Sequence, residues 1–232
     1  MESGSAADWF SGVASALAVI VALAGYWLAD WQRRKDLKER ERGAAQMIGV
    51  KLLQAFNRTA VIHKHLWPVD VPKLQGDDGT HLWRHIQPLA GLQDDPSAAL
   101  SEPEINLLIA MNAHQFLSGI TMVIARYQSL TASMREYGVR YGAMMELTPA
   151  PDEMRGKVAV VRMDREQYMK LIPYTLALEG LLQSLRELSA ENLEHAKTLC
   201  RQYNPMMKAH FKATRFLSLG IPDDNKAATP DA

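Results

Sequence analysis

The chain has 232 residues, which suffices for one sizeable domain or for one domain with a short anchor. It carries 26 basic and 26 acidic residues. This balance argues against a general nucleic-acid-binding protein, because such proteins usually carry a basic excess. The single cysteine, Cys200, excludes an intrachain disulfide and is expected to be an ordinary core residue.

An uncharged stretch near the N-terminus runs from Trp9 to Ala29, with aromatic residues at both of its ends. A helix over residues 9–31 spans roughly 34 Å, enough to cross a hydrocarbon layer of about 30 Å. A cleaved signal peptide fits less well, because residues 1–8 contain no Lys or Arg. A buried core helix also fits less well, because apolar runs of this length are uncommon in soluble cores. The sequence therefore predicts one transmembrane helix over residues 9–31, with the lipid bilayer as its partner.

The residues that follow this stretch predict its orientation. Residues 32–42 hold six basic side chains, whereas residues 1–8 hold none. Cytoplasmic flanks carry such a basic excess, so residues 1–8 are expected to be a short extracytoplasmic tail. The rest of the chain is then expected on the cytoplasmic side of the plasma (inner) membrane.

Three long series of mostly apolar residues, spaced alternately three and four apart, dominate the remaining sequence. The first is Ala45, Ile48, Leu52, Ala55, Thr59, Ile62 and Leu66. The second is Ile109, Ala113, Phe116, Ile120, Val123, Tyr127, Leu130, Met134, Tyr137, Tyr141 and Met144. The third is Leu171, Tyr174, Leu178, Leu181, Leu185, Leu188, Asn192, His195 and Leu199. Each series places one apolar seam along a helix, which predicts an all-α fold with an elongated cytoplasmic helical bundle over residues 32–219.

Capping residues and prolines set the expected helix ends. Ser101 and Glu104 have the spacing of a capping box, and Asp164 is a plausible second N-cap. Pro173 is expected to kink the third long helix or to move its start. Asn204–Pro205 is expected to end that helix and to open a short C-terminal helix over residues 206–218. Residues 220–232 are polar and are expected to form a disordered tail.

Two segments, 67–100 and 147–163, lack helical periodicity and contain several prolines or glycines. Within the second, residues 157–162 predict a single β-strand. A lone strand needs a partner, and residues 69–71 are the only candidate that the sequence offers. The fold is therefore expected to contain at most one very small β-pair.

Four histidines are the best candidates for chemistry: His63, His65, His81 and His85. With Asp77 and Asp78 nearby, they are candidate ligands of a metal site. Their spacing matches no specific metal motif, because the chain has neither HExxH nor a cysteine pair. Ordinary surface histidines are the simpler interpretation. No cofactor is predicted, because no nucleotide-binding loop or catalytic motif is present.

A di-iron centre is excluded because the chain contains no Glu-x-x-His motif. Asn192 and His195 are instead expected to lie in or beside the seam as a hydrogen-bonded polar pair that fixes helix register.

Three functions follow from these observations. The favoured one is a membrane-anchored helical scaffold or regulatory protein without catalytic activity, which binds an unidentified protein partner or forms a homo-oligomer. One alternative is a metal-dependent hydrolase that uses the four histidines. The other is a membrane-perturbing protein of the holin or toxin type, against which the large helical domain argues.

Overall fold

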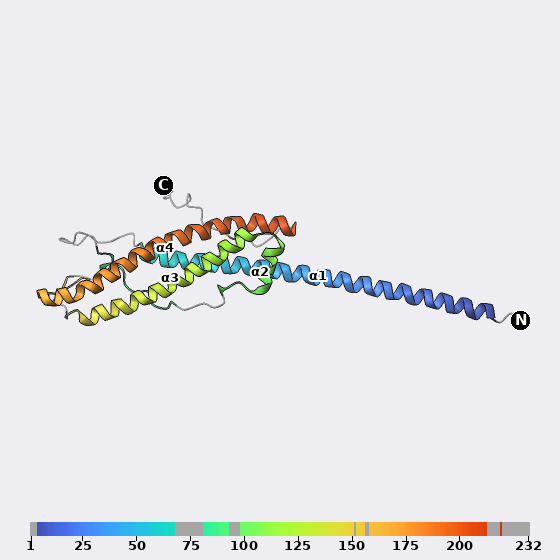
Figure 1. Cartoon of the computed structure of the whole chain (residues 1–232), viewed down its shortest axis with the longest axis horizontal. Coiled ribbons are helices and arrows are strands. Elements are labelled where there is room, and N and C mark those ends of the chain that lie inside the picture. The colour runs from blue at the N-terminus through green and yellow to red at the C-terminus, as the bar shows by residue number, and fades with distance from the viewer. Residues whose placement is uncertain are drawn as a thin grey trace, which may run out of the picture. The chain divides into compact units, whose positions relative to one another are not determined.

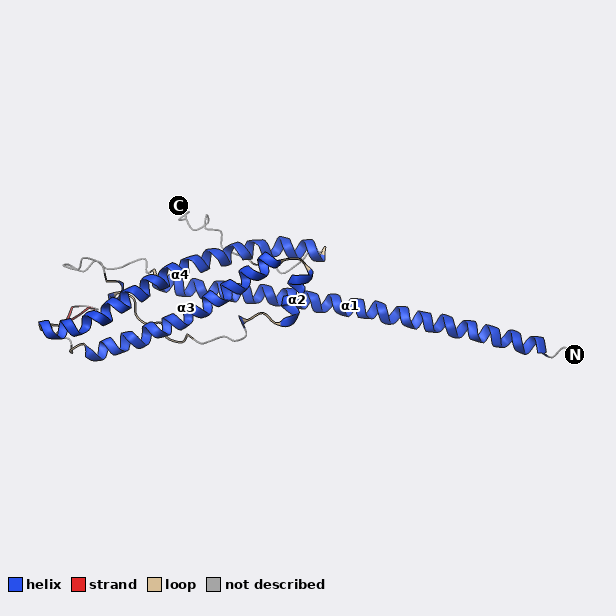
Figure 2. Cartoon of the chain, viewed as in Figure 1, coloured by secondary structure: helices blue, strands red, loops and turns tan. Residues whose placement is uncertain are grey.

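The computed structural model describes residues 4–67, 81–92, 98–150, 152–155, 158–212 and 219. The side chains of residues 4–12, 14–16, 154–155 and 158–160 lie outside the described part. Nearly all described residues are helical (Figure 2). The all-α class and the helical bundle predicted from the sequence are therefore confirmed.

The described residues form four α-helices, one short 3-10 helix and one pair of strands. In chain order these are α1 (Gly4–Leu66), η1 (Leu82–Arg84), α2 (Glu102–Ala110), α3 (His114–Leu147), β1 (Glu153–Arg155), β2 (Val158–Val160) and α4 (Arg165–Phe211). The chain divides into two units, residues 1–46 and 47–232, and α1 contributes residues to both.

The predicted seam of α1 is confirmed along its whole length. Its seven members, from Ala45 to Leu66, are at most 2% exposed. This follows from a period of about 3.6 residues per turn, which keeps positions three and four apart on one side of a helix. Ile62 and Leu66 join a core cluster with side chains of α3 and α4.

Helices α3 and α4 run side by side in opposite directions and form most of that cluster (Figure 1). Buried members of the predicted second and third series extend from Phe116 to Met144 and from Leu171 to Leu199. Tyr174 of the third series is 38% exposed, so its predicted place in the seam is wrong. The segment from Leu82 to Leu92, which contains η1, also packs on this core. Within it, Ile86 is only 2% exposed. Residues 82–92, which have no helical periodicity, therefore still contribute to the core.

Two glycines stand where helices approach closely. A Cβ atom added to Gly49 of α1 would lie 2.8 Å from the ring of Tyr203, and one added to Gly119 of α3 would lie 2.9 Å from Leu199. Both facing side chains belong to α4 and are buried. A larger residue at either position would therefore push α4 away from its neighbour.

The second seam begins later than predicted. Helix α2 ends at Ala110, and Asn112 adopts a left-handed conformation with φ of 53°. A new helix, α3, starts at His114, so the direction of the chain changes between the two. Ile109 is 46% exposed for this reason, and its predicted place in the α3 seam is wrong.

The predicted break at Asn204–Pro205 is also wrong, because α4 continues through both Pro173 and Pro205 to Phe211. Each proline removes only one backbone hydrogen bond, and both rings are exposed, so the free carbonyl groups can bind water. Tyr203 and Met207, on either side of Pro205, are fully buried and hold the helix on the bundle. Residues 213–218 of the predicted C-terminal helix lie outside the described residues.

The starts of α2 and α4 were predicted correctly. Ser101 and Glu104 form the expected capping box of α2, and Asp164 accepts the backbone N–H of Gln167 at the start of α4. The strand predicted over residues 157–162 is present as β2, but its partner is β1 in an antiparallel pair. This pairing is local, because only two residues separate the two strands along the chain. The other predicted partner, residues 69–71, lies outside the described residues.

Among the described residues, no helix combines the length and the apolar character needed to cross a membrane. The transmembrane helix predicted over residues 9–31 is therefore not supported by the structure. The side chains of residues 9–12 and 14–16 lie outside the described part. Of the predicted tails, residues 4–8 belong to α1, and residues 1–3 and 220–232 lie outside the described residues.

Candidate functional site

The four candidate histidines come from two elements: His63 and His65 belong to α1, and His81 and His85 flank η1. His63 Nδ1 lies 3.2 Å from Ser189 Oγ of α4, and His65 Nε2 lies 2.7 Å from the backbone oxygen of Gln87. His81 precedes η1 and lies near Trp83, with 6.4 Å between the ring centroids. His63 and His65 are two residues apart on α1, so their side chains point in directions about 200° apart.

No group of three or more metal-ligating side chains comes together within the described residues. Asp77 and Asp78, the acidic residues of the predicted site, lie outside that part of the chain. Burial lowers the pKa of His63 below its usual value, and the nearby Lys197 acts in the same direction. A neutral His63 bonded to Ser189 fits a role in holding α1 against α4.

The C-terminal end of α1 is held by an arginine of α4. Arg186 Nε donates a hydrogen bond of 2.8 Å to the backbone oxygen of Leu66. The same guanidinium group stacks over the ring of Trp67, 4.4 Å from its centroid. The last carbonyl groups of a helix lack partners within the helix, so this arginine caps α1.

A tyrosine fixes the segment that follows η1. Tyr137 of α3 is fully buried, and its hydroxyl donates to the backbone oxygen of Ile86. Burial raises the pKa of Tyr137 well above its usual value, so the phenol remains a proton donor. This contact joins the segment from Leu82 to Leu92 to the core of the bundle.

The buried amide of Asn192 joins three helices. Its nitrogen donates to Thr59 Oγ1 of α1 at 3.1 Å and to the backbone oxygen of Val123 of α3 at 3.3 Å. Its own oxygen is buried without a hydrogen-bond partner. Asn192 was predicted to pair with His195, but the hydrogen bonds of its amide nitrogen go to α1 and α3. The expected role in fixing helix register fits these contacts.

Asn192→Ala is expected to destabilise the bundle by roughly 1–3 kcal/mol, because Thr59 and the Val123 carbonyl would lose a buried donor. Thermal unfolding of the full chain in mild detergent, followed by circular dichroism, measures this change. Gln183→Ala, which truncates an exposed amide of the same helix, should leave the midpoint nearly unchanged. Equal midpoints for both variants would contradict the role of Asn192.

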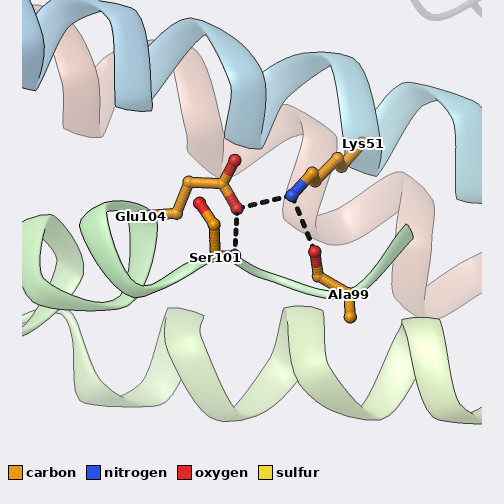
Figure 3. Close-up of polar contacts among 4 residues, drawn as sticks. All are labelled: Lys51, Ala99, Ser101 and Glu104. Carbon is orange, nitrogen blue, oxygen red and sulfur yellow. Dashed lines mark hydrogen bonds and ion pairs between the residues drawn. The ribbon is translucent and has the colours of Figure 1, made fainter. Parts of the chain in front are cut away.

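A buried ion pair, not anticipated from the sequence, fastens α2 to α1 (Figure 3). Lys51 Nζ lies 2.8 Å from Glu104 Oε2 and donates to the backbone oxygen of Ala99 at 2.7 Å. The same carboxylate oxygen accepts the backbone N–H of Ser101 at 2.7 Å. Lys51 is only 9% exposed and Glu104 only 3%. One feature of the sequence could have indicated this pair: Lys51 follows Ile48 by three residues and therefore lies beside the apolar seam of α1.

Cys200 is buried, as predicted, and burial raises the pKa of its thiol to about 11. Such a thiol is protonated at neutral pH and is a poor nucleophile. The burial of Cys200 therefore supports a role in the core of the bundle.

Many of the exposed large apolar side chains belong to two stretches of the described chain. One lies where α3 ends and α4 begins, and its members are Val139, Met145, Leu147, Tyr168, Met169, Tyr174 and Leu176. A shallow hollow of about 300 Å³ in this region is lined by Arg140, Pro173, Tyr174 and Ala177. Large exposed apolar patches on a soluble protein usually mark a contact with another molecule.

The other region is the N-terminal part of α1. Its large exposed apolar side chains are Leu17, Val19, Ile20, Val21, Leu23, Tyr26, Trp27, Leu28 and Trp31. Val19, Ile20 and Val21 are consecutive and at least 59% exposed. At about 100° per residue they point to three different sides, so this stretch lacks a polar face.

Comparison with protein-family models, with curated proteins and with solved structures gave no significant match.

Proposed function

We propose that this chain is a non-catalytic helical scaffold that α1 anchors in the plasma (inner) membrane. The single observation that carries this proposal is the stretch of α1 with exposed apolar side chains on every side. A surface helix of a globular protein keeps one polar face, whereas a helix that is apolar all round is covered by protein or by lipid. Residues 9–29 contain no charge, which favours lipid.

The flanking residues support this assignment. Tyr26, Trp27 and Trp31 are more than half exposed, and aromatic rings of this kind prefer the boundary between lipid and water. The six basic residues within 32–42 favour a cytoplasmic position for the bundle. The bundle then presents its contact surfaces at the membrane without crossing it.

The scaffold role rests on how the described polar groups are used. Arg186, Asn192 and Lys51 bond across helices, and Tyr137 bonds the segment after η1 to α3. These contacts support one fixed arrangement of the bundle. The exposed apolar residues at the end of α3 and the start of α4 offer a surface for a protein partner. A homo-oligomer is a further part of the proposal, since Ala14, Ala18 and Ala22 lie four apart and small residues let helices approach closely in lipid.

Replacement of Ile20 and Leu23 together by Lys is expected to release the full chain from membranes. Each charge near the middle of a spanning helix costs about 2.5–3.5 kcal/mol of insertion free energy. Extraction of membranes with alkaline carbonate, followed by immunoblotting of pellet and supernatant, measures the release. The double variant Val61→Lys with Val139→Lys places the same charges at similarly exposed positions outside the anchor and should remain in the pellet.

Two results would contradict the proposal. Carbonate extraction of the unchanged chain would show that α1 does not span the bilayer. Alkaline phosphatase fused after Ala232 should be inactive if the bundle is cytoplasmic, so an active fusion would reverse the orientation.

A further inference from the structure

The residues that follow the proposed anchor are arranged by charge around α1. Trp27, Trp31, Lys35, Lys38 and Arg42 are spaced four, four, three and four residues apart. Because each residue turns a helix by about 100°, these five side chains lie within one stripe about 80° wide. All five are exposed, and two aromatic rings are therefore followed by three cations on one side of α1. We call these residues the Trp-cation stripe.

The aromatic and cationic parts of the stripe are in direct contact. Lys35 Nζ lies 5.9 Å from the centroid of the Trp31 ring, a cation–π distance. Arg34 lies at the edge of the stripe and pairs with Asp30 at 2.7 Å. Glu39 and Glu41 lie just outside the Trp-cation stripe, each about 40° beyond one of its edges.

The opposite side of the same segment has a different charge pattern. Arg33 and Arg40 lie there, and Asp36 stands three residues after the first and four before the second. At these spacings a carboxylate neighbours both guanidinium groups on the helix surface and offsets their charge. The side of α1 that carries the Trp-cation stripe has four cations, with Arg34 included, and two carboxylates, whereas the opposite side has two cations and two carboxylates. The excess of positive charge therefore lies on the side of the stripe.

The depth of the stripe suits a lipid headgroup. With Trp31 at the edge of the hydrocarbon, a rise of about 1.5 Å per residue places Lys35 about 6 Å and Lys38 about 10 Å farther out. The headgroup region is roughly 5–8 Å thick, and charges act in saline over about 8–10 Å. Both ammonium groups then lie within reach of lipid phosphates.

We infer that the Trp-cation stripe binds the headgroups of anionic phospholipids and selects them over zwitterionic ones. The charge pattern favours this partner, because a stripe of three cations next to interfacial tryptophans matches a negatively charged lipid surface. The inference rests on the proposed membrane anchor and adds the lipid class that the anchor prefers. Each cation near such a surface is expected to raise the preference about fivefold.

Quenching of tryptophan fluorescence by brominated lipids tests the inference. The full chain is reconstituted in phosphatidylcholine vesicles that contain increasing fractions of brominated phosphatidylglycerol, with brominated phosphatidylcholine as the reference. Retention of the chain after carbonate washing is measured first. At low salt, quenching should show a relative binding constant of phosphatidylglycerol over phosphatidylcholine of at least about fivefold. About 1 M salt should abolish this preference, because it shortens the screening length to about 3 Å.

Two matched variants locate the preference. Lys35→Gln with Lys38→Gln should bring the relative binding constant close to one. Arg33→Gln with Arg40→Gln removes the same charge from the other side of the helix and should retain most of the preference.

The outcomes are separable. A chain that washes out of the vesicles overturns the anchor. A retained chain with no preference, or one whose preference both double variants reduce equally, overturns the Trp-cation stripe and leaves the anchor intact.

Discussion

Phe116→Ala is expected to lower the free energy of unfolding of the bundle by about 3–5 kcal/mol. Phe116 is only 5% exposed, and its ring lies 6.5 Å from that of Tyr203, which is fully buried on α4. Truncation removes apolar contact area and leaves a cavity between α3 and α4 that the neighbouring residues fill only in part. Leu185→Ala, at 1% exposure on α4, is expected to cost about 2–5 kcal/mol for the same reason.

Thermal unfolding of the full chain in mild detergent, followed by circular dichroism, measures both effects. For a domain of this size, the melting midpoint should fall by roughly 10 °C in the Phe116 variant. Val139→Ala is the matched control, because Val139 belongs to the same helix and is 69% exposed. A Phe116 variant that melts with this control would show that the α3 seam does not face α4.

The seams were predictable from the sequence because burial and helical periodicity act together. A residue such as Ile48 or Leu52 has to be covered, and a spacing of three and four fixes which side of the helix is covered. The helix starts at Ser101 and Asp164 were predictable because capping is local, with donor and acceptor three residues apart.

Features that depend on backbone exceptions were not predictable. The left-handed Asn112 separates α2 from α3 although the apolar spacing continues through it. Pro205 stops many helices, but here the burial of its neighbours Tyr203 and Met207 outweighs one lost hydrogen bond. At Pro205 the packing of the flanking side chains therefore decides the local conformation.

Contacts between distant residues were also beyond the sequence patterns. Asn192 was placed in the seam, but its bond to Thr59 joins residues 133 apart. Lys51 and Glu104 are 53 residues apart in the sequence, and no sequence motif links the two. The spacing of apolar residues predicts on which face of its helix a residue lies. It does not predict which residue of another helix packs against that face.

The two parts of α1 differ in how their apolar residues are covered. From Ile48 to Leu66 the seam is buried by the bundle, whereas the residues around Ile20 remain exposed in the structure. A lipid bilayer would cover the second group and would place the Trp-cation stripe at its surface. The same helix would then carry the anchor, the proposed lipid contact and part of the bundle core.

Lys51→Met is expected to destabilise the bundle by about 3–5 kcal/mol, because it leaves a buried carboxylate without its cation. Glu104 would then keep only the backbone N–H of Ser101 among its described partners. Unfolding of the full chain in detergent measures the loss. Lys170→Met is the matched control, since Lys170 and Glu166 are also 2.8 Å apart but mostly exposed, and should cost less than about 1 kcal/mol.

The double variant Lys51→Met with Glu104→Gln separates charge from packing. The amide introduced by Glu104→Gln keeps an oxygen that can accept the Ser101 N–H, so the cap of α2 survives while the buried charge disappears. The double variant should therefore be more stable than Lys51→Met alone, although it carries one more substitution. If the two single losses simply add, the charges are not coupled, and Lys51 would hold α2 on α1 through its methylene chain and its bond to Ala99.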